Sequence, residues 1–516
     1  MLLRVIAAIA LFMVLAPTAR AAQWWKGTTK HFVIYSEGSR EDTEQLAVKM
    51  ERLDQVLRIV TSTGNRDETD SPSAKLTVYQ FGDSDDIEML IGAPGSGVAG
   101  FFIPRAGASV AFVPLRMANA TVGPGISNRD WADPNEILFH EYTHYFMFQH
   151  TPAAYPAWYS EGLAEVFGTL RLTPDGFDLG APSKDRAYAL RTFDPDLTVF
   201  FDPPKLLDVN MIYAGGWLLT SYLSFEPSRA GQLRDYLNRL NKGEKSIDAA
   251  RAAFGDLKKL GKEVSAYRTG RIRGLVARFP GYVPPSVELQ QLSEAESAAI
   301  PVQLRSRRGV TAKQAPGLAA RARKVLEQFP DDETVLLMAG EAEIDAQNLD
   351  AGEAHATRAL TLDPRSVLGE LLLARSSMER GRKESAQFAR AREHYLLANR
   401  IDPDNAEALA GYYNTYLFAN EAAPEGALIA LERAFELAPF DDTIRLTLAY
   451  QLLTEKRGRE TIAVLGPIVN SPHQGKRRDK YRSIVAQIEA GQVDAAIPLL
   501  RPKMPDPNAD DDSEEE

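Results

Sequence analysis

The C-terminal part of the chain carries a repeat that limits what it can fold into. Prolines at positions 330, 364, 403, 439 and 472 each follow a segment with helical periodicity, at intervals of 34, 39, 36 and 33 residues. Proline ends a helix because it lacks the N–H that the hydrogen-bond ladder needs. Small residues recur twelve and five positions before three of these prolines: Gly352, Ala391 and Ala427, then Ala359, Ala398 and Ala434. Since helices pack closely where side chains are small, the pattern predicts stacked helical units over residues 292–500.

A period of about 34 residues resembles the tetratricopeptide repeat. The longer intervals fit insertions near residues 380–390 and 419–426, and the first and last units match poorly, as capping units often do. The resemblance implies an all-α solenoid that binds a protein partner. The alternative is an irregular helical bundle whose periodicity arises by chance.

Residues 22–285 mix strand and helix patterns instead. Three stretches are typical of strands, the last of them either a hairpin or one long bent strand: HFVIYS, KLTVYQF and FFIPRAGASVAFVPL. After the first stretch, Ser39 and Asp42 predict the start of a helix with apolar residues at helical spacing. The chain to about residue 125 is therefore expected to be α+β with a small mixed sheet, and mainly helical beyond.

The segment that carries chemistry is HEYTH, which contains His140, Glu141 and His144. Asp133 and Pro134 precede it as a capping acid and a first-turn proline, so a helix is expected over residues 134–149. Residues four apart project from one helix face, so the two histidines can present ring nitrogens to one ion. HEYTH is an instance of H-E-x-x-H, the helical zinc-protease signature.

A second segment, WYSEGLAE, supplies carboxylates downstream. Ser160 is expected to cap a second helix, with Glu161 in its first turn and Glu165 one turn later on the same face. A catalytic zinc typically keeps three protein ligands and one open position, so Glu161 is predicted as the third ligand. Glu165 is placed to accept the other ring N–H of a ligand histidine. Because the chain contains no cysteine, any metal must be held by histidine and carboxylate side chains.

HEYTH followed by WYSEGLAE resembles the gluzincin metallopeptidases, and most closely their peptidase-MA-like members. The resemblance implies an α+β metallopeptidase domain with one Zn²⁺ per chain, held by His140, His144 and Glu161. It also implies hydrolysis of a peptide or protein substrate by zinc-activated water, with Glu141 as general base. It extends weakly through HFVIYSEG, VAGFF and YAGGWLLTSYL. The gap between His144 and Glu161 is slightly shorter than in thermolysin-like relatives.

Two further features near the motif are candidates for substrate contacts. Tyr213 in YAGGW can donate a hydrogen bond to an oxyanion, with aromatic packing as the alternative role. The strand at residues 101–115 can pair with an extended substrate by edge addition, or it can be a core strand.

The N-terminal residues indicate where the protein is located. Arg4, an apolar run at residues 5–15 and Ala19-Arg20-Ala21 predict a secretory signal peptide over residues 1–21. The run is shorter than the roughly 20 residues that span a bilayer, and no later segment is suited to span one. Export to a periplasm or another envelope space, or secretion, is therefore expected.

Residues 501–516 end in DPNADDDSEEE, which predicts an acidic disordered tail. No basic face indicates nucleic-acid binding.

Three functions fit these features. The first is an exported zinc peptidase whose helical repeats bind a protein partner or present substrate. The second is a non-catalytic envelope scaffold in which the repeats are the functional part and zinc is structural. The third is a zinc hydrolase acting on a non-peptide envelope amide. An intact Glu141 favours the first over the second, because a structural zinc site needs no base.

Overall fold

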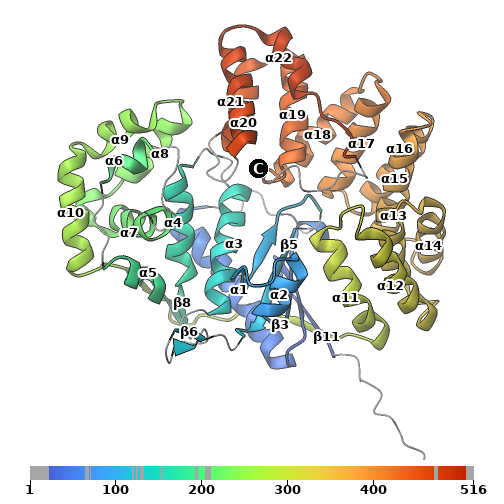
Figure 1. The fold of residues 1–516 in the computed structure, drawn as a ribbon, viewed down its shortest axis with the longest axis horizontal. Helices are drawn as coiled ribbons and strands as arrows, with labels where there is room; N and C mark the ends of the chain where they lie inside the picture. Colours follow the sequence, from blue (N-terminus) through green and yellow to red (C-terminus); the bar gives the residue numbers. More distant parts are fainter. Residues whose placement is uncertain are drawn as a thin grey trace, which may run out of the picture.

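The structure, a computed structural model, is shown in Figure 1. It describes residues 23–63, 69, 71–107, 109–118, 121–123, 126–127, 133–150, 153, 155–191, 196–203, 211–469 and 475–506. The expected signal peptide (residues 1–21) and most of the expected acidic tail (from residue 507) lie outside these residues. Within the described ranges, we find no helix that combines the length and the apolar character needed to cross a membrane.

The N-terminal part is built on a six-stranded mixed sheet with the strand order β11-β1-β2-β3-β5-β4. The central neighbours β2, β3 and β5 are parallel, and the outer pairs are antiparallel. The strands are β1 (Trp25–Thr28), β2 (Phe32–Ser36), β3 (Leu76–Asp83), β4 (Phe101–Ile103), β5 (Val110–Arg116) and β11 (Glu288–Gln291). The stretch at residues 101–115 is thus a hairpin, not one bent strand, and β4 is the edge strand beside α3.

Helices cover both faces of this sheet. Because strand residues alternate in direction, Val78 enters the core shared with α1 (Arg40–Thr61) and α3 (Pro134–His150). Its neighbour Tyr79 enters a second core with α2 (Ser84–Ile91) and α11 (Glu294–Arg308). Ser39 caps α1 in a capping box with Asp42, as the sequence predicted. The helix α11, which begins the C-terminal array, is therefore joined to the sheet by apolar packing.

A helical subdomain follows α3, together with short strands. Its helices are α4 (Ala157–Gly168), α5 (Lys184–Ala189), α6 (Thr198–Phe201), α7 (Gly216–Phe225), α8 (Gln232–Asn241), α9 (Ser246–Phe254) and α10 (Leu257–Thr269). A π-helical turn (Met211–Gly215) leads into α7, and 3-10 turns occur at Pro72–Ala74 and Pro227–Arg229. The strands β8 (Arg171–Thr173), β9 (Gly176–Leu179) and β10 (Leu275–Arg278) form one small sheet, and β6 (Thr121–Gly123) and β7 (Ile126–Ser127) form a pair.

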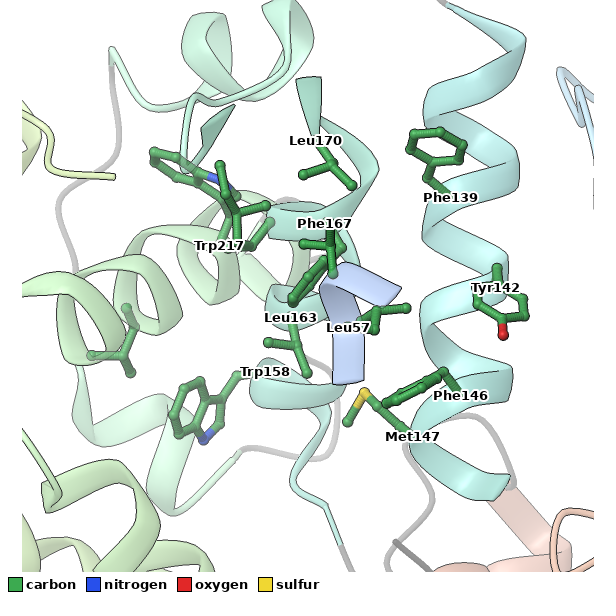
Figure 2. Packing of buried hydrophobic residues seen from close by; sticks show 14 of the residues in the cluster. Leu57, Phe139, Tyr142, Phe146, Met147, Trp158, Leu163, Phe167, Leu170 and Trp217 are labelled. Atoms are coloured by element: carbon green, nitrogen blue, oxygen red, sulfur yellow. The ribbon is translucent and has the colours of Figure 1, made fainter. Parts of the chain in front are cut away.

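The aromatic face of α3 fixes the rotation of this helix. Phe139, Tyr142 and Phe146 are buried at i, i+3 and i+7 and belong to one core with Leu57 of α1. Figure 2 shows Phe139 and Phe146 on the side of α3 that faces α4. The hydroxyl of Tyr142 also donates to the buried carboxylate of Asp54 at 2.7 Å. With this face held in the core, the adjacent residues of α3 are directed toward α4.

Two glycines allow α4 to approach α7 closely. A Cβ on Gly162 would lie 2.3 Å from the carbonyl oxygen of Gly216, and one on Gly216 would lie 2.4 Å from the carbonyl oxygen of Trp158. Real Cβ atoms do not approach backbone this closely, so any side chain at these positions forces the helices apart. Gly162 directly follows Glu161, and the helix crossing therefore determines where that carboxylate lies.

We expect Gly162→Ala to lower the free energy of unfolding by about 1–3 kcal/mol, because the added methyl group overpacks the crossing of α4 and α7. Urea denaturation followed by circular dichroism measures this change. The matched control is Gly317→Ala in α12 (Ala315–Gln328), where a Cβ would have no neighbour within 4 Å. That control should be neutral or stabilising by up to about 1 kcal/mol. Equal effects of the two substitutions would contradict the close approach.

The C-terminal part is all helical, as predicted, and consists of helix pairs consistent with TPR-like repeats. Consecutive helices pack on one another from α12 to α21. The helices after α11 are α12 (Ala315–Gln328), α13 (Glu333–Asp345), α14 (Leu349–Leu362), α15 (Val367–Gly381), α16 (Gln387–Ile401), α17 (Ala406–Ala419), α18 (Glu425–Leu437), α19 (Asp442–Thr454), α20 (Gly458–Val469), α21 (Gly475–Glu489) and α22 (Val493–Leu500).

The repeat pattern in the sequence corresponds to this array. Pro330, Pro364, Pro403 and Pro439 each lie two residues beyond the end of α12, α14, α16 and α18. The recurring small residues lie inside the helix packing, where the five recurring alanines have no exposed surface and a Cβ on Gly352 would meet Ile344 at 2.6 Å. The two insertions enlarge the loops within the α15–α16 and α17–α18 pairs. Pro472 lies outside the described residues.

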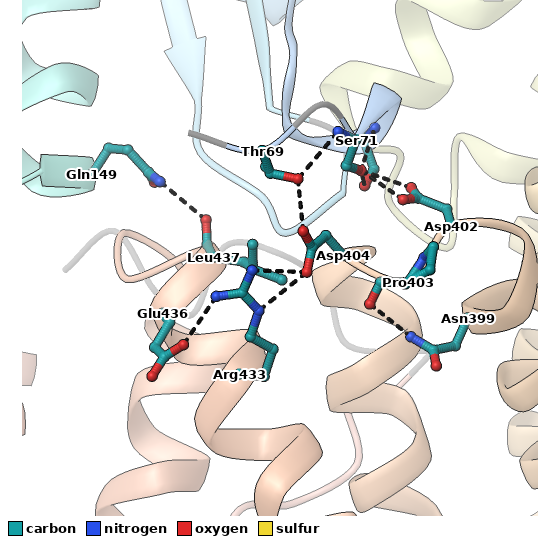
Figure 3. Close-up of polar contacts among 11 residues, drawn as sticks. Thr69, Ser71, Gln149, Asn399, Asp402, Pro403, Asp404, Arg433, Glu436 and Leu437 are labelled. Carbon is teal, nitrogen blue, oxygen red and sulfur yellow. Dashed lines mark hydrogen bonds and ion pairs between the residues drawn. The ribbon is translucent and has the colours of Figure 1, made fainter. Parts of the chain in front are cut away.

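The array curves around the sheet, so that its C-terminal helices reach α3 (Figure 1). Three hydrogen bonds shown in Figure 3 join the two parts: Thr69 to Asp404 at 2.7 Å, Ser71 to Asp402 at 2.7 Å, and the Gln149 amide to the Leu437 carbonyl at 3.1 Å. The tip of the β4–β5 hairpin adds another, from the N–H of Ala106 to the Asp441 carboxylate at 2.9 Å. The array therefore contacts both the hairpin and the end of α3.

Candidate metal centre

Local sequence rules position the two histidines. The helix α3 begins at Pro134, and the Asp133 carboxylate accepts the N–H of Asn135 at 2.9 Å, which satisfies one unpaired donor of the first turn. His140 and His144 follow one turn apart, and their Nε2 atoms lie 3.2 Å from each other. Both side chains are half-buried between α3 and α4.

Glu161 of α4 completes a triangle with the two rings. One of its carboxylate oxygens lies 3.3 Å from Nε2 of His140 and 3.3 Å from Nε2 of His144, and the residue is only 1% exposed. Within the described part of the chain, these three residues are the one group of histidine and acidic side chains compact enough to hold a metal ion.

The triangle has the dimensions of one face of a zinc coordination tetrahedron. Bond lengths of about 2.0–2.1 Å place neighbouring tetrahedral ligands about 3.3–3.4 Å apart. The three distances here are 3.2, 3.3 and 3.3 Å. The donor set of two imidazoles and one carboxylate is also one that catalytic zinc sites use, with a fourth position left open. The residues present therefore fit a zinc ion.

Glu165 contacts the far side of the His140 ring. Its carboxylate lies 3.4 Å from His140 Nδ1, and both of its oxygens accept hydrogen bonds from the Arg186 guanidinium at 2.9 Å. Such a bidentate pair fixes the carboxylate, which in turn fixes the orientation and tautomer of the imidazole. Arg186 lies in α5, and nothing in its sequence neighbourhood distinguishes it from the chain's other arginines.

These carboxylates make the site favourable for positive charge. Burial lowers the pKa of His140, but its hydrogen bonds to Glu161 and Glu165 outweigh burial and raise that pKa to about 10. Burial raises the pKa of Glu165, yet its hydrogen bonds with His140 and Arg186 bring that pKa below its usual value. The site therefore favours a cation between the rings and the carboxylates, either a proton or a metal ion.

We expect Glu165→Gln to weaken zinc affinity about 10- to 100-fold. A neutral amide fixes the orientation of the His140 ring less firmly than a carboxylate does, and it raises the basicity of the imidazole less. Competition with a chromogenic chelator measures the zinc dissociation constant. Asp178→Asn is the matched control, since Asp178 is also paired with arginines (Arg171 and Arg278) but lies on β9. Unchanged affinity in Glu165→Gln would remove Glu165 from the site.

The predicted helix start at Ser160 is wrong. The helix α4 begins at Ala157, and Pro156 occupies the cap position, four residues before Ser160. Proline fits there because its φ is already suited to the chain entering a helix. Ser160 is instead buried, and its hydroxyl lies 3.3 Å from Nδ1 of His144. It thus orients the second ring much as Glu165 orients the first, a role that the sequence did not reveal.

Tyr213 lies in the π-helical turn before α7 and is close to the metal-binding triangle. Its ring stacks over that of His140 at a centroid distance of 6.0 Å, and the Arg186 guanidinium lies 4.9 Å from its centroid. Burial, followed by the charges of Glu161 and Glu141, raises the pKa of Tyr213, so its hydroxyl stays protonated and able to donate. The structure therefore brings Tyr213 beside the triangle.

Two cavities open beside the triangle, and Glu141, His140 and Tyr213 line both of them. The first, of about 240 Å³, extends toward Glu165 and Arg186. The second, of about 560 Å³, extends past His144 and Glu161 toward β4 and the C-terminal helices. Glu141 is half-buried and is thus accessible from both sides of the site.

Comparisons with known proteins add little to this geometry. No family model matches the chain. The search of curated proteins finds no match either. Among solved structures, the chain is similar to the crystal structure of a thermophilic TPR protein of Thermus thermophilus, at 17% identity and a TM-score of 0.31, over 37% of this chain and 96% of that one. At this level the similarity carries no argument, and the repeat architecture rests on the helix pairs described above.

Proposed function

We propose that this chain is a zinc-dependent peptidase of the gluzincin type. The observation that supports the proposal most strongly is the triangle of His140, His144 and Glu161, whose edges match a tetrahedral zinc site. Glu141 lies next to the first ligand and faces both cavities, which is where a general base is needed. A purely structural zinc site would use neither an open cavity nor this base.

The roles of the chain's own groups follow from their positions. Zinc bound at such a site acts as a Lewis acid and lowers the pKa of a water molecule to about 7. Glu141 accepts the proton of the attacking water and delivers it to the leaving amine. Tyr213 is placed to donate a hydrogen bond to the oxygen that develops negative charge. Glu165 and Ser160 hold the rings of His140 and His144 in their orientations.

The substrate we propose is an extended polypeptide. The edge strand β4 lies beside α3, and its Phe102 lines the larger cavity with the metal-binding residues. An edge strand offers unpaired backbone groups to which an extended peptide can add as a further strand. The TPR-like array adds a protein-interaction surface. The expected signal peptide extends the proposal to action outside the cytoplasm.

Cleavage of an unfolded protein tests this function. The full chain without its signal peptide, loaded with zinc, should generate new N-termini in a reduced and carboxymethylated test protein. Removal of zinc with a chelator should stop the cleavage, and added zinc should restore it. Absence of zinc-dependent cleavage across a panel of such proteins would argue against a peptidase and favour the scaffold function.

A further inference from the structure

The larger cavity beside the metal-binding triangle has two walls from distant parts of the sequence. One wall comes from the β4 end and from α3 and α4, where Phe102, Pro104 and Phe148 accompany the site residues. The other comes from the C-terminal helices and is formed by Phe440, Asp442, Arg445, Pro467 and Ile468. The helical array thus contributes directly to the cavity that the reacting bond must enter.

The second wall is fixed to the metal-binding helix. The ring of Phe440 packs on that of Tyr145, the residue that follows His144, at a centroid distance of 5.0 Å. One turn further along α3, the Gln149 amide donates to the carbonyl of Leu437 at 3.1 Å. Because both contacts come from α3 itself, the wall keeps a defined position relative to the histidines.

The side chains that this second wall presents to the cavity are mainly apolar. Phe440, Pro467 and Ile468 present rings and aliphatic groups. Its two charged residues are engaged elsewhere: Asp442 pairs with Arg477 at 2.9 Å, and Arg445 is only 2% exposed. The Arg445 guanidinium donates to the carbonyl of Val464 at 2.8 Å and to that of Pro439. The wall is therefore suited to an apolar side chain.

We propose that the end of the helical array is a specificity element of the site, which selects an apolar side chain next to the scissile bond. The inference rests on the proposed peptidase function and adds its substrate class. The substrate is an unfolded segment, in which the side chain beside the cleaved bond inserts between Phe102 of β4 and Phe440 of the array. The cavity volume of about 560 Å³ lies within the roughly 300–1,000 Å³ typical of small-molecule sites, which is enough for one side chain and the bond beside it. A folded domain does not fit there.

The arrangement gives the TPR-like array a second role besides binding a partner. Burial of an aromatic or branched side chain against Phe440 and Ile468 removes apolar surface from water, and each such contact strengthens binding of the correct substrate. A glycine or a charged residue at the same position gains nothing there.

The test uses two peptide hydroxamates that differ only in a benzyl or a methyl side chain. Their dissociation constants from the zinc-loaded full chain are measured by calorimetry, so the readout does not depend on turnover. We expect the benzyl compound to bind wild type at least 10-fold more tightly than the methyl compound. Phe440→Ala should reduce this ratio at least fivefold, and Phe440→Leu should retain most of it.

Controls separate this inference from the proposed function. Ile429→Ala, at an exposed site on α18 (59% exposed), should leave the ratio unchanged. Thermal melts and zinc content confirm that each variant is folded and loaded. A ratio near one in wild type, or an unchanged ratio in Phe440→Ala, would overturn the specificity role. Benzyl selectivity without any Glu141-dependent cleavage would instead refute the peptidase function while leaving the apolar wall established.

Discussion

Glu141→Gln is expected to retain one zinc ion per chain and to lose peptide cleavage by about 100- to 10,000-fold in kcat. Glutamine matches glutamate in size, so the half-buried position of residue 141 on α3 is preserved. It cannot accept a proton, so the attacking water is no longer activated by a base. The Michaelis constant should change little, because glutamine keeps the size of the side chain at position 141, which lines both cavities.

The measurement is the initial rate on a fluorogenic peptide at saturating substrate, with zinc content determined on the same samples. Glu136→Gln is the matched control, since Glu136 also lies on α3 and lines the smaller cavity but is not one of the three residues of the triangle. It should keep activity within a few-fold of wild type. Full activity in Glu141→Gln would remove Glu141 as the base and leave the zinc site without its proposed chemistry.

His144→Ala is expected to abolish stable zinc binding and, with it, all activity. Two of the three triangle edges end at His144 Nε2, so the substitution leaves only His140 and Glu161 to hold the ion. A ligand that binds only the folded state stabilises it, by about 4 kcal/mol at a thousandfold excess over its dissociation constant. Wild type should therefore gain this much from zinc, and His144→Ala should gain almost nothing.

Thermal unfolding with and without zinc measures the difference. His150→Ala is the control, because His150 lies at the end of the same helix, packs on Phe146 at a centroid distance of 4.4 Å and is not part of the triangle. Its zinc-dependent shift should equal that of wild type. A His144→Ala protein that still binds zinc tightly would show that the ion is held elsewhere.

Local rules in the sequence predict much of the fold. The start of α3 follows from Asp133 and Pro134, and that of α1 from Ser39 and Asp42, because a cap acts within one helical turn. The helix ends before Pro364 and Pro403 follow in the same way from the chemistry of proline. These features depend on neighbours along the chain, which a sequence displays directly.

The site itself was only partly predictable. His140 and His144 are four residues apart on a helix, which predicts that their rings lie on the same face. Glu161 was predicted because a catalytic zinc site typically has three protein ligands. The contacts of Ser160 and Arg186 could not be foreseen, because they depend on where α4 and α5 lie in space. For Ser160 the local rule misled, since a serine near a helix start is typical of a cap.

The contribution of the helical array to the larger cavity could not be predicted from the sequence. Phe440 lies almost three hundred residues after His144, and nothing in its repeat differs from a unit that merely packs on its neighbours. Phe440 lies beside Tyr145 because the whole array is curved. This curvature accumulates from a small rotation between each helix pair and the next. Only the folded chain brings these residues together.

The most direct test is anomalous diffraction at the zinc edge from crystals of the zinc-loaded protein. The account predicts a single strong peak about 2.0–2.2 Å from Nε2 of His140, Nε2 of His144 and a carboxylate oxygen of Glu161. Crystals grown with excess zinc that show no peak between these three residues, or show the ion bound elsewhere, would contradict it.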